Sequence, residues 1–363
     1  MTPMSESVKR LMCDISWRFP GSRWFSSRNP FVLFYHGVAR KGTGQEVDAE
    51  AFERHIVFLK RHFEVVPPDE VHKRRSPFSK KRVIITFDDG FRNNAEVAAP
   101  ILRKYEVPAI FFVSSRHVKA GKYLWVDYLG ALARFFPGEG FQFAGRSWDM
   151  SEAQRVETMV RLTSMLLDMK SHPLEMYRAI EEELPRLEEF LGEHELRDRL
   201  WGMTPEQVRD LGRDPLFKIG CHTLDHPYLT RCEPAECMRQ LKENKQWIEG
   251  VTGRRCDTVS YPLNDYDRRV IGFCRELGFN TGYAVRPRIK AFPEFEVRRI
   301  GVYSPDLSFL GLKANWSNVL LRLTSLESFE SLLDRIRDAA LVGSKEIGKQ
   351  VRGNQSRQAD RAG

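Results

Sequence analysis

The feature that most constrains the fold is a series of seven short apolar runs, most of them separated by segments with helical spacing. The runs are residues 31–35 (FVLFY), 83–87 (VIITF), 109–113 (AIFFV), 217–221 (FKIGC), 257–261 (DTVSY), 280–285 and 297–303. Strands that alternate with helices imply a parallel sheet. Seven such units around one core predict an α/β fold, an irregular (β/α) barrel of about seven strands, with an open doubly wound sheet as the competing architecture.

One stretch interrupts this alternation. Residues 128–200 contain no convincing strand. Within them, the apolar residues recur with helical spacing at Val156, Met159, Val160 and Met165. We predict a helical insertion, which either shapes the substrate cleft or only decorates the barrel. The barrel then spans residues 31–305, with a helical region at 306–343 and a polar, basic tail at 344–363 that we expect to be disordered.

The positive charge of the chain is concentrated at its two ends. The net charge is +8, and residues 1–30 and 344–363 each carry five basic and two acidic residues, so the ends supply +6 of it. The first segment also contains four aromatic residues, Trp17, Phe19, Trp24 and Phe25. Such ends could bind an anionic membrane surface; solvated tails and a helix packed on the barrel are the alternative. No basic stripe crosses the folded part, so nucleic-acid binding is not expected.

The sequence predicts a cytoplasmic protein. Residues 1–25 carry charges where a secretory signal would need an unbroken apolar core, and no apolar run approaches the roughly 18 residues of a membrane span. We expect a cytoplasmic location, with peripheral contact at the inner face of the membrane through the basic ends. In that reducing compartment the six cysteines should be free thiols.

Two adjacent carboxylates follow the second apolar run. VIITF leads directly into Asp88, Asp89 and Gly90, which places the carboxylates at the carboxyl end of a strand, where active sites of β/α barrels lie. Successive residues of an extended chain point to opposite sides, so one carboxylate can bind a metal while the other faces the substrate water. The alternative is that one Asp only caps the following helix.

Two imidazoles follow the fourth apolar run. FKIGC is followed by His222 and, four residues later, by His226, at the same end of the barrel as the carboxylates. Two imidazoles with one carboxylate form a three-ligand set that leaves positions open for water and substrate, as in a catalytic zinc site. An isolated HxxxH pattern is weak evidence, but two carboxylates at another strand end make it informative.

The segments TFDDG (86–90) and HTLDH (222–226), in this order and spacing, resemble motifs of the polysaccharide deacetylases, carbohydrate esterase family 4. The resemblance covers about residues 31–303, apart from the insertion. It implies a hydrolase that removes N-acetyl groups from sugars, with Asp88 as the catalytic base and one divalent ion, expected to be zinc. The implied metal ligands are Asp89, His222 and His226.

A third motif of the family, a Pro with an aromatic residue and a Gly in a turn after a strand, is matched only in part by SYPLNDY (260–266). Leu263 stands where an aromatic residue is usual and Asn264 where Gly is usual, although Asn tolerates left-handed backbone better than most residues. The Leu263 N–H is still expected to donate to an oxyanion, because a main-chain donor does not depend on the side chain. The departures bear on the side-chain wall of the cleft, where we place Tyr261 as a substrate-binding residue.

The general acid departs further from the family pattern. Many members use a late His, and this sequence has no His after His226. His36 follows FVLFY at the same rim as the carboxylates, and members that begin with a similar YH segment use it in this way, so His36 is our candidate acid. A packed His that only orients a neighbour is the alternative.

Three further residues are candidates for the substrate cleft. Trp125 and Asp127 directly precede the insertion, and Arg299 near the last apolar run could hold a carboxylate or phosphate. The competing interpretations are a core aromatic residue for Trp125 and a surface ion pair for Arg299.

The sequence therefore predicts metal-dependent hydrolysis of an N-acetyl group on an amino sugar. Because no export signal is visible, the expected substrate is a nucleotide- or lipid-linked precursor of lipopolysaccharide or another cell-surface glycan. The alternatives are another C–N hydrolase on the same scaffold, such as a deformylase, and a catalytically silent glycan-binding protein. The intact DDG and HTLDH segments argue against the silent protein.

Overall fold

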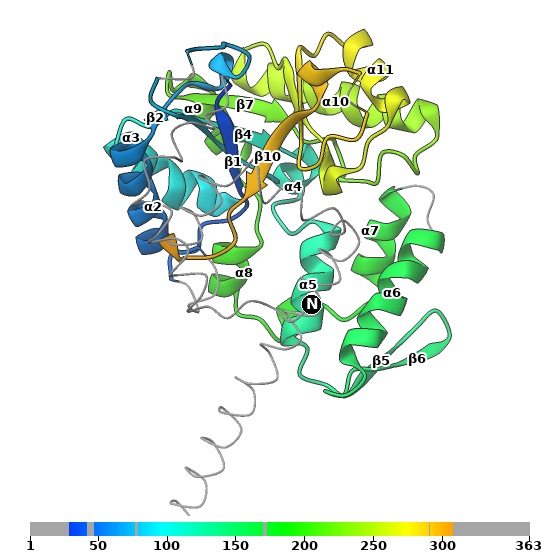
Figure 1. Cartoon of the computed structure of the whole chain (residues 1–363). Helices are drawn as coiled ribbons and strands as arrows, with labels where there is room; N and C mark the ends of the chain where they lie inside the picture. The colour runs from blue at the N-terminus through cyan, green and yellow to red at the C-terminus, as the bar shows by residue number, and fades with distance from the viewer. Residues whose placement is uncertain (1–28, 42–46, 77–78, 170–172, 290, 308–363) are drawn as a thin grey trace, which may run out of the picture. The chain divides into compact units, whose positions relative to one another are not determined.

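The computed structural model describes residues 29–41, 47–76, 79–169, 173–289 and 291–307 (Figure 1). The described chain forms two compact units. The first contains the residues up to Lys122 and from Arg197 onward, and the second contains Tyr123–Leu196. The predictions for the basic aromatic segment 1–30, the helical region 306–343 and the tail 344–363 fall almost entirely outside the described residues.

The first unit contains a closed barrel of seven parallel strands. Neighbouring strands follow the order β1-β10-β9-β8-β7-β4-β3, and β3 pairs with β1 to close the ring. Figure 1 shows β1, in blue, beside β10, in orange. The strands are β1 (Phe31–Tyr35), β3 (Arg82–Phe87), β4 (Ala109–Val113), β7 (Phe217–Cys221), β8 (Thr258–Ser260), β9 (Thr281–Ala284) and β10 (Val297–Gly301). The barrel prediction is confirmed, and the open sheet is excluded because β1 and β3 pair along five residues.

Helices occupy the chain between these strands. They are α2 (Ala49–His62), α3 (Ala99–Lys104), α4 (Ser115–Ala120), α9 (Pro205–Arg213), α10 (Pro234–Thr252) and α11 (Arg268–Glu276). Short helical turns are η2 (Pro68–Glu70), η3 (Asn94–Ala98), η5 (Pro262–Asn264) and η6 (Pro293–Phe295). A two-residue strand that the sequence does not predict, β2 (Glu64–Val65), pairs with the start of β3.

Alternate strand residues face the barrel interior and the surrounding helices. The interior cluster of buried side chains includes Val32, Ile84, Ile110, Phe112 and Tyr283. Their chain neighbours pack in the large core between strands and helices, among them Leu33, Ile85 and Phe111. This period of two decides which side chains reach the mouth of the barrel.

Five of the six cysteines lie in the described residues, and all five are buried free thiols, as expected. The sixth, Cys13, lies outside them. In the described part of the chain, no helix is both long and apolar enough to cross a membrane.

The second unit is mainly helical. Its helices are α5 (Trp125–Phe135), α6 (Arg155–Met169) and α7 (Pro173–Glu182), with the turn η4 (Leu187–Glu189), and α8 (Glu193–Arg199) leads back to the first unit. It also contains an antiparallel hairpin, β5 (Gly140–Phe143) and β6 (Arg146–Asp149), where we expected no strand. The hairpin turns at Ala144 and Gly145, both with positive φ; Ala is a rare residue at such a position, which hid the turn from the sequence.

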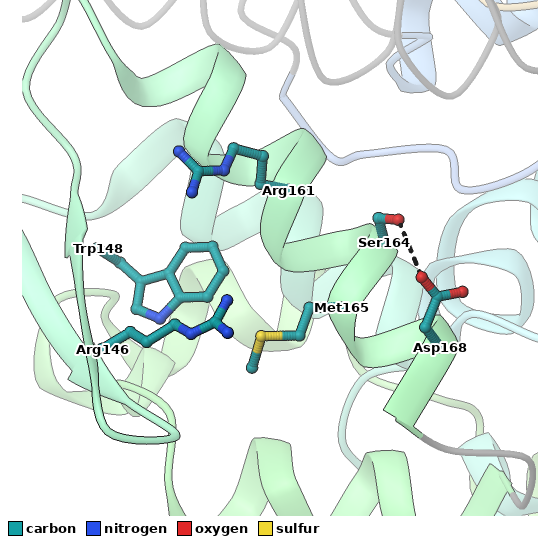
Figure 2. Close-up of a pocket in the computed structure, with 6 residues that line it drawn as sticks. All are labelled: Arg146, Trp148, Arg161, Ser164, Met165 and Asp168. Carbon is teal, nitrogen blue, oxygen red and sulfur yellow. Dashed lines mark hydrogen bonds between the residues drawn. The ribbon is translucent and has the colours of Figure 1, made fainter.

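A surface depression of about 450 Å³ lies between β6 and α6 in this second unit (Figure 2). It is lined by Arg146, Trp148, Arg161, Ser164, Met165 and Asp168. This lining contains a single carboxylate and no imidazole or thiol. It therefore offers no ligand set for a catalytic metal, and the hydrolytic chemistry has to be sought in the barrel.

Candidate active site

Asp88 and Asp89 follow β3 at the mouth of the barrel. Ile84 faces the interior, and strand alternation sends Asp88 to the same side. Asp89 and Gly90 then adopt left-handed φ angles of 71° and 84°, so the chain turns sharply after Asp88. At Gly90 a Cβ would also lie only 3.0 Å from Val113. The turn leaves both carboxylates buried, each 4% exposed.

His222 and His226 lie in the loop after β7. The amide of His222 donates to the carbonyl of Val113, which extends the pairing of β7 with β4. Thr223 and His226 have φ angles of 64° and 55°, and the Thr223 hydroxyl accepts from the His226 N–H at 3.2 Å. The loop therefore curls back on itself and brings the centres of the two imidazole rings to 5.0 Å from each other.

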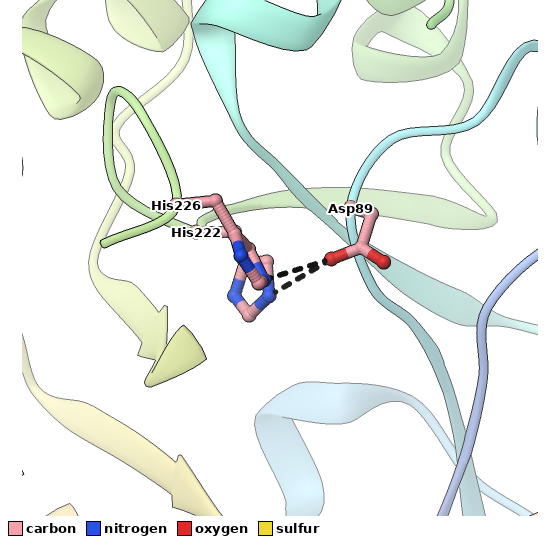
Figure 3. A group of neighbouring side chains, drawn as sticks. All are labelled: Asp89, His222 and His226. Atoms are coloured by element: carbon pink, nitrogen blue, oxygen red, sulfur yellow. Dashed lines mark ion pairs between the residues drawn. The ribbon is translucent and has the colours of Figure 1, made fainter. Parts of the chain in front are cut away.

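Asp89, His222 and His226 form one compact cluster (Figure 3). The Nε2 atoms of His222 and His226 lie 3.2 and 3.3 Å from Oδ1 of Asp89, and both point at this oxygen. Burial opposes ionisation of Asp89, but the contacts with the two imidazoles hold its pKa well below the usual range. The carboxylate is therefore charged, as a metal ligand must be.

The tautomer of His222 shows that a metal ion fits this cluster. Its Nδ1 lies 2.8 Å from the carbonyl oxygen of Ser260, which can only accept, so Nδ1 carries the proton. In the neutral ring the lone pair of Nε2 then faces the Asp89 carboxylate. The Nε2 lone pair and the carboxylate oxygen are both acceptors, and they face each other at such a short distance when a cation lies between them. A backbone carbonyl that accepts from the other ring nitrogen is a common support for an imidazole that binds a metal.

Arg299 reaches Asp88 from β10. Its Nη1 and Nη2 donate to the two carboxylate oxygens at 2.6 and 2.7 Å, and Nη2 also donates to the Ser260 hydroxyl. The guanidinium lies over the rings of Phe34 and Phe112, 4.6 and 5.4 Å from their centres. We expected Arg299 to hold a substrate anion or to form a surface ion pair. Instead it is 2% exposed and holds a carboxylate of the protein itself.

This pair keeps Asp88 ionised. Burial alone would raise the pKa of the carboxyl group, but the charge of Arg299 and the hydrogen bonds from its guanidinium bring it below the usual value. Asp88 is therefore an anion at neutral pH. Because a general base acts only when deprotonated, turnover that depends on Asp88 should fall as the pH drops through this lowered pKa.

Replacement of Arg299 by Lys should move the acidic limb of the pH profile to higher pH. Lys keeps the charge but loses the two-pronged hydrogen bonding, so the pKa of Asp88 rises and the base is protonated at higher pH. The measurement is kcat/KM against pH, with Arg298→Lys as a neighbouring control. A limb at unchanged pH in Arg299→Lys would show that Arg299 does not set the pKa of Asp88.

Leu263 lies in η5, directly after β8. Leu263 and Asn264 both have left-handed φ angles, 55° and 54°, a conformation that costs a residue such as Leu about 1–2 kcal/mol. The Asn264 side chain holds the turn by accepting from the N–H groups of Val285 and Arg286. Within the described residues the Leu263 N–H donates to no acceptor. It could therefore donate to an oxyanion, and that role stays a prediction.

His36 follows β1 and approaches the second oxygen of Asp89. Its Nε2 lies 3.8 Å from Oδ2, whereas His222 and His226 face Oδ1. The side chain is 20% exposed, compared with 3% and 5% for the other two imidazoles. Its ring stacks on Tyr303 at 5.8 Å. His36 is therefore placed beside the cluster with access to solvent, and its role as the acid stays a prediction.

The remaining predicted cleft residues are placed differently. Tyr261 is 2% exposed, its hydroxyl donates inward to the carbonyl of Phe295, and its ring stacks on Tyr266. Its side chain has no surface to offer a substrate. Trp125 is equally buried, and Asp127 is half-buried, both at the start of α5 in the second unit. Their contact with substrate stays a prediction.

Two supporting residues escaped the sequence analysis. Ser260 supports the metal-ligand cluster and the base: its carbonyl accepts a hydrogen bond from His222, and its hydroxyl accepts one from Arg299. His117 of α4 lies 3.1 Å from the carbonyl of Asp89 and 2.7 Å from that of Leu200, so it braces the turn after β3. Ser260 lies in the apolar run 257–261, close to its carboxyl end and so to the active rim, which was a usable signal; no sequence pattern marked His117.

Fold and site together define a class of enzyme: a β/α-barrel hydrolase with an Asp–His–His metal-ligand set and an ionised carboxylate beside it. The family model described as polysaccharide deacetylase matches residues 75–282. The chain belongs to the polysaccharide deacetylase family, hydrolases of the amide C–N bond of acetylated sugars.

Individual relatives agree with this assignment. A putative polysaccharide deacetylase of Bacillus subtilis, YxkH, is 28% identical over 274 residues, 73% of this chain and 69% of that protein. A poly-β-1,6-N-acetyl-D-glucosamine N-deacetylase of Staphylococcus aureus is 33% identical over 93 residues, 25% of this chain and 32% of that protein. The structure of the Streptococcus pyogenes deacetylase PplD in complex with acetate is similar in fold, with a TM-score of 0.51 and 15% identity over 78% of this chain and 96% of that one.

Proposed function

We propose that this protein removes the N-acetyl group from an amino sugar in a precursor of a cell-surface glycan. The observation that carries the proposal is the placement of an ionised, buried Asp88 directly beside the Asp89–His222–His226 cluster. A three-ligand set leaves positions open for water and for an amide carbonyl. An adjacent carboxylate can then take the proton of the attacking water.

Each of the residues assigned to the site has one task in this hydrolysis. Asp89, His222 and His226 would hold a divalent ion, which we propose to be zinc and which would supply polarisation of the carbonyl and acidification of water. Asp88 accepts the proton of the water as its oxygen bonds to the acetyl carbon. The Leu263 N–H donates to the oxygen that becomes negative. His36 then gives a proton to the nitrogen as the C–N bond breaks, which releases acetate and a free amino sugar.

The carrier of the sugar and the location of the enzyme belong to the same proposal. We place the reaction in the cytoplasm or at the inner face of the membrane, on a nucleotide- or lipid-linked sugar. This rests on the basic residues concentrated in segments 1–30 and 344–363, which suit an anionic substrate. Cell fractionation tests it: protein found only outside the cytoplasmic membrane contradicts the location.

A different C–N hydrolase on this barrel, such as a deformylase, would use the same ligands and the same base. The poly-β-1,6-N-acetyl-D-glucosamine N-deacetylase among the relatives favours acetyl over formyl. The two activities are separated by offering N-acetyl and N-formyl forms of the same sugar.

The deciding experiment measures bound metal and released acetate in one preparation. Wild-type protein should contain one divalent ion per chain and release acetate from at least one member of a panel of nucleotide-linked, lipid-linked and oligomeric N-acetyl sugars. The double variant His222→Ala, His226→Ala should contain no stoichiometric metal and release none. Metal that persists in the double variant would mean that the ligands lie elsewhere, and a metal-loaded protein inactive on the whole panel would favour a silent glycan-binding protein.

A further inference from the structure

Tyr303 is an exposed aromatic side chain beside the candidate active site. It lies two residues beyond the end of β10, and 47% of its surface is exposed. In the described residues, large apolar side chains with comparable exposure are Val57 and Leu174. An exposed aromatic ring at the rim of a catalytic site has a plain physical use, because it presents an apolar face to a ligand.

The position of this ring is fixed by its neighbours. It stacks on His36, with ring centres 5.8 Å apart and an angle of 25°, and meets Phe34 edge to face at 5.8 Å. Phe34 in turn lies beneath the guanidinium of Arg299, which holds Asp88. Tyr303 therefore belongs to the same packed set of rings as the groups assigned to the chemistry. A ring that is already fixed loses little conformational entropy when a ligand packs on it.

Gly301 gives a second, independent sign that the ring position is specified. A Cβ built at Gly301 would lie 2.5 Å from Cε2 of Tyr303 and 2.8 Å from its Cζ and hydroxyl oxygen. The ring therefore lies directly against the backbone at the end of β10, in space that any other residue at position 301 would fill. The sequence Gly301-Val302-Tyr303 thus places an aromatic ring over the strand end.

From these contacts we infer that Tyr303 is a stacking platform for a pyranose ring of the substrate. A pyranose presents several C–H bonds on one face, and an aromatic ring that is apolar in the middle and polar at its hydroxyl suits such a face. This inference rests on the proposed function and adds to it the class of ligand: a cyclic sugar, rather than any acylated amine, is recognised at the rim.

The spacing suits a sugar that carries its amide directly on the ring. The His36 imidazole connects Tyr303 to the cluster, because its ring stacks on Tyr303 and its Nε2 lies 3.8 Å from Oδ2 of Asp89. A substrate whose amide reaches Asp89, His222 and His226 therefore has its ring, or the next ring of the chain, over Tyr303. A linear acyl amine would gain nothing from this platform.

The test compares Tyr303→Ala with Tyr303→Phe, and uses Val57→Ala on α2 as a matched exposed apolar control. Metal-loaded proteins are assayed for acetate release from N-acetylglucosamine, from its β-1,4- and β-1,6-linked tetramers and from an aryl acetate ester that has no sugar ring. Binding of the same saccharides is measured by calorimetry in the Asp88→Asn background, where no turnover complicates the result.

We expect Tyr303→Ala to weaken saccharide binding and to lower kcat/KM on saccharides about 3- to 10-fold, the range expected for one aromatic contact. The loss should lie mainly in KM, whereas hydrolysis of the aryl ester should be unchanged. Tyr303→Phe, which keeps the aromatic ring, should lose less than Tyr303→Ala, and Val57→Ala should behave as wild type.

Three results would overturn the inference. The first is a saccharide affinity that is unchanged in Tyr303→Ala. The second is an equal loss of kcat/KM on saccharide and ester, which would mean that Tyr303 only orients His36. The third is that the protein binds none of the saccharides. If the wild-type protein releases no acetate from any sugar but binds saccharides more weakly after Tyr303→Ala, the proposed function fails while the platform stands.

Discussion

Asp88→Asn should lower turnover about 10²- to 10⁴-fold, the usual contribution of a general base, while the bound metal stays stoichiometric. The amide has the shape of the carboxylate but cannot take a proton from water at neutral pH. Asp88 lies outside the ligand cluster, and its oxygens bond Arg299 rather than either imidazole of the cluster. Acetate release and elemental analysis on one preparation measure both quantities.

Asp89→Asn is the matched counterpart, because the two residues are adjacent and equally buried, each 4% exposed. This variant should lose the metal, since an amide is a poor substitute for the anionic ligand that His222 and His226 face. If Asp88→Asn lost the metal and Asp89→Asn kept it, the assignments of base and ligand would have to be exchanged.

A control is needed for stability, because Asp88→Asn leaves the guanidinium of Arg299 buried without its counter-ion. Breaking a buried pair on one side commonly costs about 3–5 kcal/mol of folding free energy. The double variant Asp88→Asn, Arg299→Met removes the stranded charge and leaves an apolar side chain between Phe34 and Phe112. It should recover much of the lost melting temperature but none of the activity; recovered activity would mean that the single variant was inactive because it unfolded.

The fold was accessible from the sequence because its signals are local. All seven barrel strands overlap the apolar runs. Runs such as those of β3, β4 and β9 are buried on both faces, so they can be recognised without knowledge of the partner strand. Asp88, Asp89, His222 and His226 could be placed at one rim for the same reason, because the carboxyl ends of parallel strands meet at one end of a barrel. Another local signal is the capping box of Thr204 and Gln207, which forms at the start of α9.

The remaining features depend on contacts that are distant in sequence. Arg299 and Asp88 are 211 positions apart, and only the pairing of β10 with β1 and of β1 with β3 brings them into one barrel interior. Tyr261 looked like a cleft residue because it borders η5, but strand alternation turns its ring into the core.

Local patterns also failed where a competing contact formed. Thr230 and Glu233 have the spacing of a capping box, yet the Thr230 amide and hydroxyl bond to Asp265, and α10 begins at Pro234 with Glu233 as its N-cap. Glycine commonly follows the end of a helix, yet Gly250 lies within α10, whose C-cap is Gly253 with a left-handed φ of 67°.

His36 is the residue on which the departure from the common family pattern depends. The sequence has no later His than His226, and His36 is a partly exposed imidazole that approaches the Asp89 carboxylate without belonging to the cluster. Its partial exposure leaves room for the nitrogen that departs from the acetyl carbon. A leaving amine needs a proton as the C–N bond breaks, and a side chain that supplies it contributes about 10²-fold or more.

His36→Gln should therefore lower acetate release from an N-acetyl sugar about 10²-fold or more and leave the metal content unchanged. Gln retains a polar side chain of similar length but has no proton to give at neutral pH. The loss should become small for an aryl acetate ester, because its leaving group departs without protonation and the acid acts only where the leaving group is poor. Tyr303→Ala provides a matched comparison, since it removes the ring that stacks on His36 but keeps the imidazole. Equal losses on amide and ester in His36→Gln, or a fall in melting temperature large enough to account for them, would remove His36 from the proton transfer and leave water bound in the site as the proton source.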